Sequence, residues 1–180
     1  MTVVELAVAL ALLAIIAAVM APAVLGRLRS SHEAVLANNL RSVTDALWSF
    51  RGDLGRFPRR LERLNTRPPL TAPFALDLCG RAIANAGAWA GPYLKREISP
   101  SGVQAGQFLI ADSLRRVPAT LAGGSIATMF IDVTDVDSAT AANMERVFDG
   151  ATLSYTTGAI RWETISGVGR LSFAITIRNC

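Results

Sequence analysis

The sequence has little of the two residue types on which most metal and nucleophile chemistry depends. Its 180 residues include one histidine and two cysteines. A structural zinc site needs four such ligands, and a disulfide-dense miniprotein needs many more cysteines. The sequence also offers no Ser-His-Asp set, no Cys/His cluster and no glycine-rich phosphate loop, which are the usual signals of catalysis. We therefore expect a protein that is not an enzyme and carries no cofactor.

Lysine and charged residues in general are also scarce. Of the 18 basic residues only Lys95 is lysine, and charged residues make up 18% of the chain against 51% hydrophobic residues. This composition excludes a disordered tail, and the length suits one domain with a core of its own. The mean hydropathy of +0.36 is high for a purely soluble domain, so the position of the apolar excess matters.

The apolar excess lies at the N-terminus. No charged residue occurs from Leu6 to Gly26, and about 20 apolar residues suffice for a helix to cross the hydrocarbon layer. A secretory signal would begin with basic residues, whereas here the first cations, Arg27 and Arg29, follow the run. We expect one N-terminal membrane span carrying one globular domain. Glu5 and Pro22 are unusual inside such a span, because a buried carboxylate is costly and proline removes a helical hydrogen bond.

The segment Met1-Thr2-Val3-Val4-Glu5-Leu6, followed by the apolar run and Pro22, resembles the mature N-terminus of type IV pilins and type II secretion pseudopilins. The family pattern places Thr at 2, Glu at 5 and Pro at 22, and each falls on its position here. The resemblance implies a leader removed by prepilin peptidase and an N-methylated amine on Met1. An alternative for Glu5 alone is that it reaches the lipid headgroups from a position close to the terminus.

The resemblance also implies a role for the first half of this helix. The chain would wait in the inner membrane and then be assembled, on a platform driven by a separate ATPase, into a helical filament outside the cell. Glu5 would pair with the N-terminal amine of a neighbouring subunit, which makes the buried carboxylate tolerable. Pro22 and Gly26 would mark where the helix bends or unwinds as the subunits pack.

The helix continues beyond the span as an amphipathic segment. Between residues 36 and 50 the apolar positions follow spacings of 4, 3, 4 and 3, which is one helical stripe; they are Leu36, Leu40, Val43, Leu47 and Phe50. The other side carries Glu33, Asn38, Arg41, Ser42 and Asp45. We expect residues 1–26 to form the membrane and filament-core half, and 27–52 the half that lies on a sheet. Gly52 and Gly55 are natural stops.

Two segments of the remaining head, residues 53–180, resemble major pseudopilins more specifically. Asp53-Leu54-Gly55-Arg56-Phe57-Pro58 matches the D-x-G-R-[YF]-P segment that follows the first helix, and residues 89–95 match W-x-G-P-Y-L-K. The Pro-Trp-Gly and calcium loop that follow in that family are not evident after Ile98, and the chain is longer than a typical major pseudopilin. The two segments therefore make a type II secretion pseudopilin an alternative to a pilin, and they do not decide between the two.

The fold class that we expect is α+β, a type IV pilin fold with a long helix on a C-terminal antiparallel sheet. Residues 53–105 would form a loop region with a short helix at 74–86, and 106–180 the sheet. Alternating β-rich segments predict its strands: 107–111, 125–133, 152–155, 159–163 and 170–178. A hairpin turn is expected at 156–158. A second short helix is expected at 138–148, capped by Asp137 or Ser138.

The two cysteines and three nearby aspartates are the remaining candidate site residues. Outside the inner membrane an even number of cysteines favours a disulfide, and Cys79–Cys180 would close about 100 residues; two unpaired thiols, or Cys180 pairing between subunits, are the alternatives. Asp132, Asp135 and Asp137 supply oxygen ligands of the kind that Ca²⁺ takes, but the spacing of a calcium-binding loop is missing. We expect no metal, with Asp135 and Asp137 as turn and cap residues.

Arginines are concentrated between positions 27 and 67, where nine occur against four acidic residues. Such a stripe holds DNA phosphates non-specifically in some proteins, but solvation, lipid headgroups and neighbouring subunits are the more usual partners. We expect a pilin that forms a homo-oligomeric filament, with the type II secretion pseudopilin as the alternative. A membrane-anchored periplasmic binding module or enzyme is the alternative of another class. Adhesion, motility, DNA uptake and secretion are left open.

Overall fold

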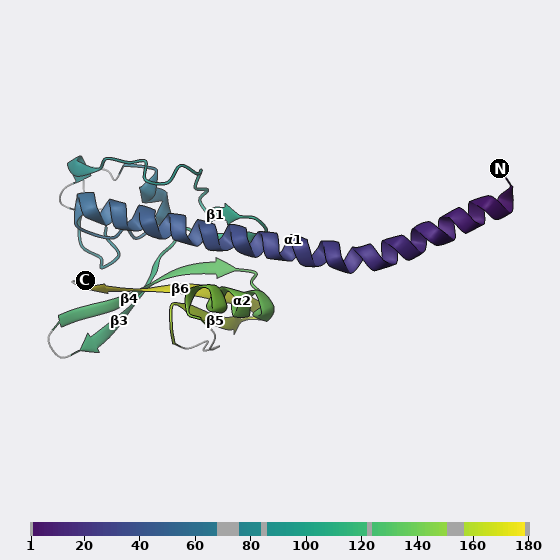
Figure 1. Ribbon diagram of the computed structural model, residues 1–180. Helices are drawn as coiled ribbons and strands as arrows, with labels where there is room; N and C mark the ends of the chain where they lie inside the picture. Colours follow the sequence, from purple (N-terminus) through teal and green to yellow (C-terminus); the bar gives the residue numbers. More distant parts are fainter. Residues whose placement is uncertain (1, 68–75, 84–85, 122–123, 151–156, 179–180) are drawn as a thin grey trace.

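The protein is described here by a computed structural model, which describes residues 2–67, 76–83, 86–121, 124–150 and 157–178. Of residues 21–23, 119–121 and 124–125 it describes only the backbone. One long helix, α1 (Val3–Leu54), runs the whole length of the molecule, and its second half lies on an antiparallel sheet (Figure 1). The coarse expectation of an α+β chain with a long N-terminal helix is therefore confirmed.

Helix α1 ends at the second of the two glycines that the sequence predicts as stops. Thr2 is the N-cap, and the helix stops at Gly55, which adopts the left-handed conformation (φ 71°) that favours glycine. The amide of Gly55 donates to the carbonyl of Arg51 at 2.7 Å and so satisfies one of the last free carbonyls. Gly52 lies inside the last turn and does not end the helix.

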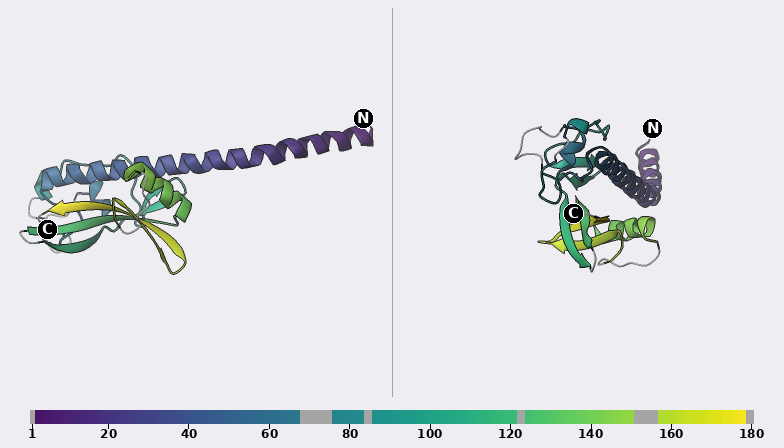
Figure 2. Two further views of the ribbon diagram at one scale, coloured as in Figure 1. Left: turned by 60° about the horizontal axis from the view of Figure 1, so that its bottom comes forward. Right: turned by 90° about the vertical axis from the view of Figure 1, so that its left-hand side faces the viewer.

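The sheet has six strands, all paired antiparallel, in the order β1-β2-β4-β6-β5, with β3 also paired to β4. The strands are β1 (Gly102–Ala105), β2 (Phe108–Ala111), β3 (Arg115–Leu121), β4 (Gly124–Thr134), β5 (Ile160–Ile165) and β6 (Val168–Arg178). The long strand β4 is central: β6 pairs with one edge, while β2 and β3 share the other at different heights. Figure 2 shows α1 along one face of this sheet.

The core lies between α1 and the sheet. The predicted stripe from Leu36 to Phe50 is confirmed, since all five of its side chains are at most 1% exposed. Facing it are the alternating residues of β4, with Met129, Ile131 and Val133 fully buried. These two patterns, with periods of 3.6 and 2 residues, bury one face of each element against the other, which is what stabilises the head.

The short elements match the expectations in part. Helix α2 (Ser138–Phe148) has the predicted bounds with Asp137 as its N-cap, and β2, β4, β5 and β6 overlap the predicted strands. The predicted strand at 152–155 lies outside the described residues, as does the first residue of the turn predicted at 156–158. Strands β1 and β3 were not predicted. Strand β1 is four residues long and is held by pairing with β2, which a local pattern does not reveal.

The short helix predicted at 74–86 is wrong over its described residues. Residues 76–83 form a tight turn closed by a bridge between Leu76 and Ala82, and a 3₁₀ turn, η2 (Ala86–Ala88), follows. The cause is Asp77, whose Oδ1 accepts the amides of Cys79 (2.9 Å) and Arg81 (2.7 Å). An aspartate that bonds the backbone amides following it favours a turn over a helix. A second 3₁₀ turn is η1 (Leu61–Leu64).

Candidate functional site

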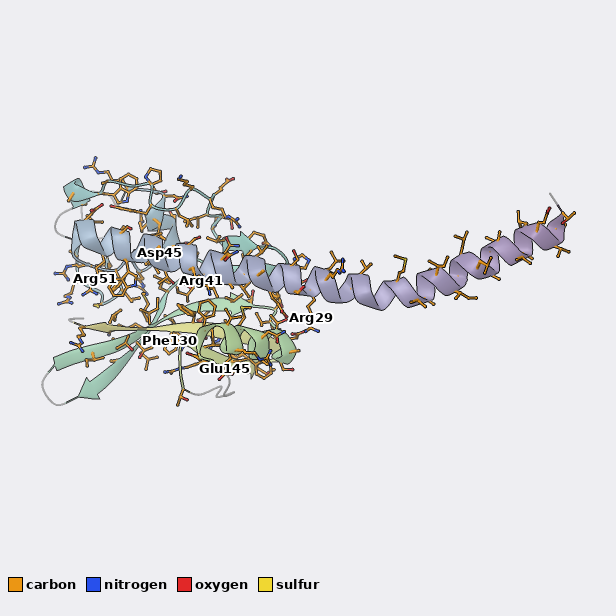
Figure 3. The ribbon with its side chains drawn as sticks, in the orientation of Figure 1. Arg29, Arg41, Asp45, Arg51, Phe130 and Glu145 are labelled. Carbon is orange, nitrogen blue, oxygen red and sulfur yellow. The ribbon has the colours of Figure 1, made fainter. Side chains whose placement is uncertain are left out.

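The first half of α1 is an exposed apolar surface. The side chains described between residues 2 and 31 are exposed, and fourteen of them are large and hydrophobic, from Val3 (85%) to Leu28 (52%). Figure 3 shows them projecting on all sides of the helix with no other part of the chain against them. Burying one such side chain stabilises a protein by about 1.5–3 kcal/mol. A surface of this size therefore needs a cover, and the helix is long and apolar enough to cross a membrane.

At the start of this surface Thr2 and Glu5 form a capping box. The Thr2 hydroxyl accepts the Glu5 amide at 3.3 Å, and Glu5 Oε2 accepts the Thr2 amide at 2.8 Å. Two amides at a helix end, which would otherwise lack partners in an apolar medium, are thereby satisfied. The carboxylate also lies at the positive end of the helix dipole. In the single chain Glu5 thus has an intrachain partner, a capping role that the sequence analysis missed although the T-x-x-E spacing signals it.

The other predicted positions of the N-terminal segment are less informative. Met1 lies outside the described residues, so its amine is not placed. The helix runs without a break through positions 22 and 26, and the Pro22 side chain is not described. Gly26 has no atom within 4 Å of the place where a Cβ would stand, so it is not required by packing within the chain. Bending or unwinding at these residues during assembly stays a prediction.

The exposed half ends where α2 docks against α1. Glu33, expected on the polar side of α1, is buried (8% exposed) and faces α2 instead. Its oxygens accept the Asn143 side-chain amide at 3.1 Å and the Thr140 hydroxyl at 3.3 Å, and Arg29 lies 3.6 Å away. These polar partners explain how a carboxylate tolerates this position. Arg29, labelled in Figure 3, also pairs with Asp137 at the start of α2.

Asp137 is the cap that joins this junction to α2. Its Oδ1 accepts the Thr140 amide at 2.7 Å. Partial burial opposes its charged form, but the hydrogen bonds from Thr140 and the Arg29 guanidinium outweigh burial and lower the pKa of Asp137 below its usual 3.8. The charged carboxylate is therefore the form that holds α2 on α1.

The two segments that resemble pseudopilins contact each other in the fold. Tyr93 donates its hydroxyl proton to Asp53 Oδ2 at 2.6 Å, and the same hydroxyl accepts the Ala90 amide at 3.0 Å. The Tyr93 ring meets Phe50 and Trp89 edge to face, with centroids 5.7 and 5.8 Å apart. Burial and the Asp53 hydrogen bond raise the pKa of the Tyr93 phenol above 10. The segment at 89–95 thus fastens the head to the end of α1.

Cys79 is disulfide-bonded, and the part of the chain that the structure describes contains no free cysteine. Its predicted partner, Cys180, lies outside the described residues, so the Cys79–Cys180 pairing stays a prediction. Cys79 itself is fixed in position by the Asp77 turn, because its amide donates to that carboxylate.

The three aspartates suggested as weak metal candidates are held by different partners. Asp132 lies in β4 and accepts two hydrogen bonds from Arg115, each 3.2 Å, and one from the Ser172 hydroxyl at 2.6 Å. Asp137 caps α2, and Asp135 occupies a left-handed turn position (φ 61°). Within the described ranges, no group of three His, Cys, Asp or Glu side chains is arranged to hold a metal ion.

Comparison of the chain with protein-family models, with curated proteins and with solved structures finds no match.

Proposed function

We propose that this protein is a structural subunit of a type IV pilus-like filament with a pilin fold. It is stored in the inner membrane through the first half of α1 and polymerised into an extracellular homo-oligomer. One observation carries the proposal: every described side chain in the apolar half of a 52-residue helix is exposed, whereas the other half packs in the core of a folded head. An apolar rod of this kind is covered by lipid in one state and by the rods of other copies in another.

The capping box supports this proposal because it prepares the helix end for an apolar environment. Both hydrogen bonds that the Glu5 carboxylate accepts from Thr2 use Oε2, and Oε1 has no hydrogen bond to a described residue. That second oxygen is available to the N-terminal amine of a neighbouring subunit, as the resemblance implies. A carboxylate buried in a filament core is costly unless a cation pairs with it, so the pairing favours one register of packing.

The pseudopilin of a type II secretion system is the second candidate. The observation that favours it is the contact between its two characteristic segments, in which the Tyr93 hydroxyl donates to Asp53 at 2.6 Å. The filament would then be short and would act in protein secretion. In both proposals, prepilin peptidase and an assembly platform are the partners, and no catalysis is assigned to the chain.

The test is electron microscopy of material sheared from cells that produce the protein, with mass spectrometry of the same fraction. Long thin filaments composed mainly of this chain, with a methylated Met1, are the expected result. Short filaments that appear only on overproduction would favour the pseudopilin. Confinement of the chain to the inner membrane under all conditions, with an unmethylated N-terminus, would contradict both and favour a membrane-anchored module.

A further inference from the structure

The end of the head farthest from the apolar half of α1 carries a cluster of arginines. They line two adjoining hollows of about 110 and 310 Å³ that meet at Cys79. We call this set the distal arginine cluster; its members are Arg51, Arg56, Arg59, Arg81, Arg116 and Arg178. The right-hand view of Figure 2 faces this end of the molecule, and Figure 3 labels Arg51 there.

Tertiary contacts bring the members together from separate parts of the chain. The Leu114 amide donates to the Arg59 carbonyl at 3.0 Å, which sets Arg59 beside the start of β3, where Arg116 lies. The turn around Asp77 supplies Arg81, and the end of β6 supplies Arg178.

The arginine-rich stretch noted in the sequence does not form one surface. Arg29 pairs with Asp137, Arg60 with Asp112, and Arg41 stacks on Phe148 with its guanidinium carbon 5.3 Å from the ring centroid. These residues are engaged within the fold. The basic surface is therefore a different set from the one that the linear spacing suggests.

Among the described residues that line the two hollows, positive charge exceeds negative charge. Among the described residues that line the two hollows, the only carboxylate is Asp77, which is 1% exposed and lies 2.8 Å from Arg56 and 3.7 Å from Arg81. Arg59, Arg116 and Arg178 are exposed and form no ion pair with a described residue. Three exposed arginines without an ion pair to a described residue, next to three that contact Asp77 or an aromatic ring, form a surface that attracts a polyanion.

The membrane that holds the chain is not that polyanion. The helix rises about 1.5 Å per residue, so the cluster lies on the order of 40 Å beyond the end of the apolar segment at Gly26. Charges in solution are screened over about 8–10 Å at physiological salt. The headgroups around the chain's own anchor are therefore out of reach of the cluster.

Two features indicate nucleic acid among the remaining polyanions. Arginine presents a planar fork that binds phosphate through two hydrogen bonds, and DNA releases condensed counterions when its phosphates are neutralised. Beside the cluster, Trp48 is 43% exposed, and the Arg51 guanidinium carbon lies 5.1 Å from its ring centroid. An exposed aromatic ring next to cations is the arrangement on which unpaired bases stack.

We infer that the distal arginine cluster binds the sugar–phosphate backbone of nucleic acid without reading its sequence, and that Trp48 contacts exposed bases of single strands. This surface is independent of the filament proposal, because it uses the free end of the head and none of the apolar half of α1. Binding is thus measurable on the single chain, whether or not filaments form.

The experiment measures fluorescence anisotropy of labelled single- and double-stranded oligonucleotides with the full chain in micelles of an uncharged detergent, over a salt series. The variant Arg59→Gln/Arg116→Gln/Arg178→Gln is compared with Arg27→Gln/Arg96→Gln/Arg146→Gln, which removes the same charge from exposed sites elsewhere. The logarithm of the binding constant falls linearly with the logarithm of the salt concentration, and each lost phosphate contact reduces the steepness of this salt dependence by about one. For the first variant we therefore expect a salt dependence that is less steep by about three and an affinity at least tenfold lower. The second variant should bind like the wild type.

Trp48→Ala should weaken the binding of single strands more than that of duplexes. Equal losses in the two triple variants would show a response to net charge alone and overturn the assignment. Equal or tighter binding of a sulfated polysaccharide in competition would overturn it in favour of a general polyanion surface. If thermal melting shows that the first triple variant is misfolded, the three single variants replace it, each with a slope loss of about one, and an unchanged slope in all three contradicts the proposal.

Discussion

At the scale of single residues, the Glu5 side chain has two roles, one in the single chain and one in the proposed filament. In the single chain its carboxylate completes the capping box with Thr2. In the proposed filament it pairs with the amine of a neighbouring subunit. The two roles are separable, because glutamine also completes a capping box but carries no charge.

We predict that Glu5→Gln and Glu5→Ala both leave the protein in the membrane and both abolish filaments, because the amine needs a charged partner. The measurement is the filament yield in sheared fractions, with the membrane content of each variant as the control. Thr2→Ser, which keeps the capping hydroxyl, should assemble normally. Filaments from Glu5→Gln but not from Glu5→Ala would show that capping, and not charge pairing, is what assembly requires.

Tyr93 is a second residue whose contribution, here to the stability of the head, can be measured separately. Its hydroxyl joins Asp53 at the end of α1 to the Ala90 amide. We predict that Tyr93→Phe, which keeps the ring contacts, lowers the free energy of unfolding by about 1 kcal/mol. Chemical denaturation of the full chain in detergent checks this. The pKa of Tyr93 is raised in the fold, so its contribution is present below pH 10 and is lost as the pH rises through the folded pKa.

The control for this prediction is the double variant with Asp53→Asn. If Tyr93 and Asp53 stabilise the head through their mutual hydrogen bond, the double variant should lose less free energy of unfolding than the sum of the losses in the two single variants. Strict additivity would contradict the coupling.

At the scale of elements, α1 is one helix with two environments. Its apolar half has no contact with the described head, and its amphipathic half forms one side of the core. The change occurs at the junction with α2, where Arg29, Glu33 and Asp137 join the two helices. Helix α2 thus marks the end of the exposed apolar half, and the ionised carboxylate of Asp137 contributes to its docking.

We predict that this docking loosens in acid. The pKa of Asp137 is lowered in the fold, so its contribution is present above the unfolded pKa and is lost as the pH falls through the folded pKa, below 3.8. Hydrogen exchange of the α2 amides in a pH series measures the effect. Asp137→Asn keeps an N-cap acceptor but does not titrate, so the exchange of its α2 amides should change less than in the wild type as the pH is lowered from about 5 to well below 3.8. An identical acid response in the variant would assign the loosening to other carboxylates.

At the scale of the whole molecule, a disulfide at Cys79 constrains the free end of the head. The predicted partner, Cys180, would tie the last residue of the chain to the Asp77 turn. Closing a loop of about 100 residues stabilises the fold by as much as about 4–5 kcal/mol in the loop-entropy account. The turn around Asp77 also carries part of the distal arginine cluster.

We predict that peptide mapping without reduction recovers one linked pair, Cys79 with Cys180, from the single chain. Reduction should lower the midpoint of chemical unfolding by an amount equivalent to about 2–4 kcal/mol. The variant Cys79→Ser/Cys180→Ser serves as the control, since a reductant should leave its midpoint unchanged. A disulfide-linked dimer in place of the intrachain pair would contradict the prediction.

What the sequence by itself determined follows from short-range patterns. The apolar run, the stripe from Leu36 to Phe50 and the capping signals at Asp137 and Gly55 predicted α1, α2 and most strands, because helical and strand periodicities repeat within a few residues. Tertiary structure alone decided the burial of Glu33, the Asp53–Tyr93 contact and the distal arginine cluster. Glu33 and Asp53 meet partners at least 40 positions away, and the cluster gathers residues from positions 51 to 178. Such pairings depend on how the elements pack, which periodicity along one chain does not record.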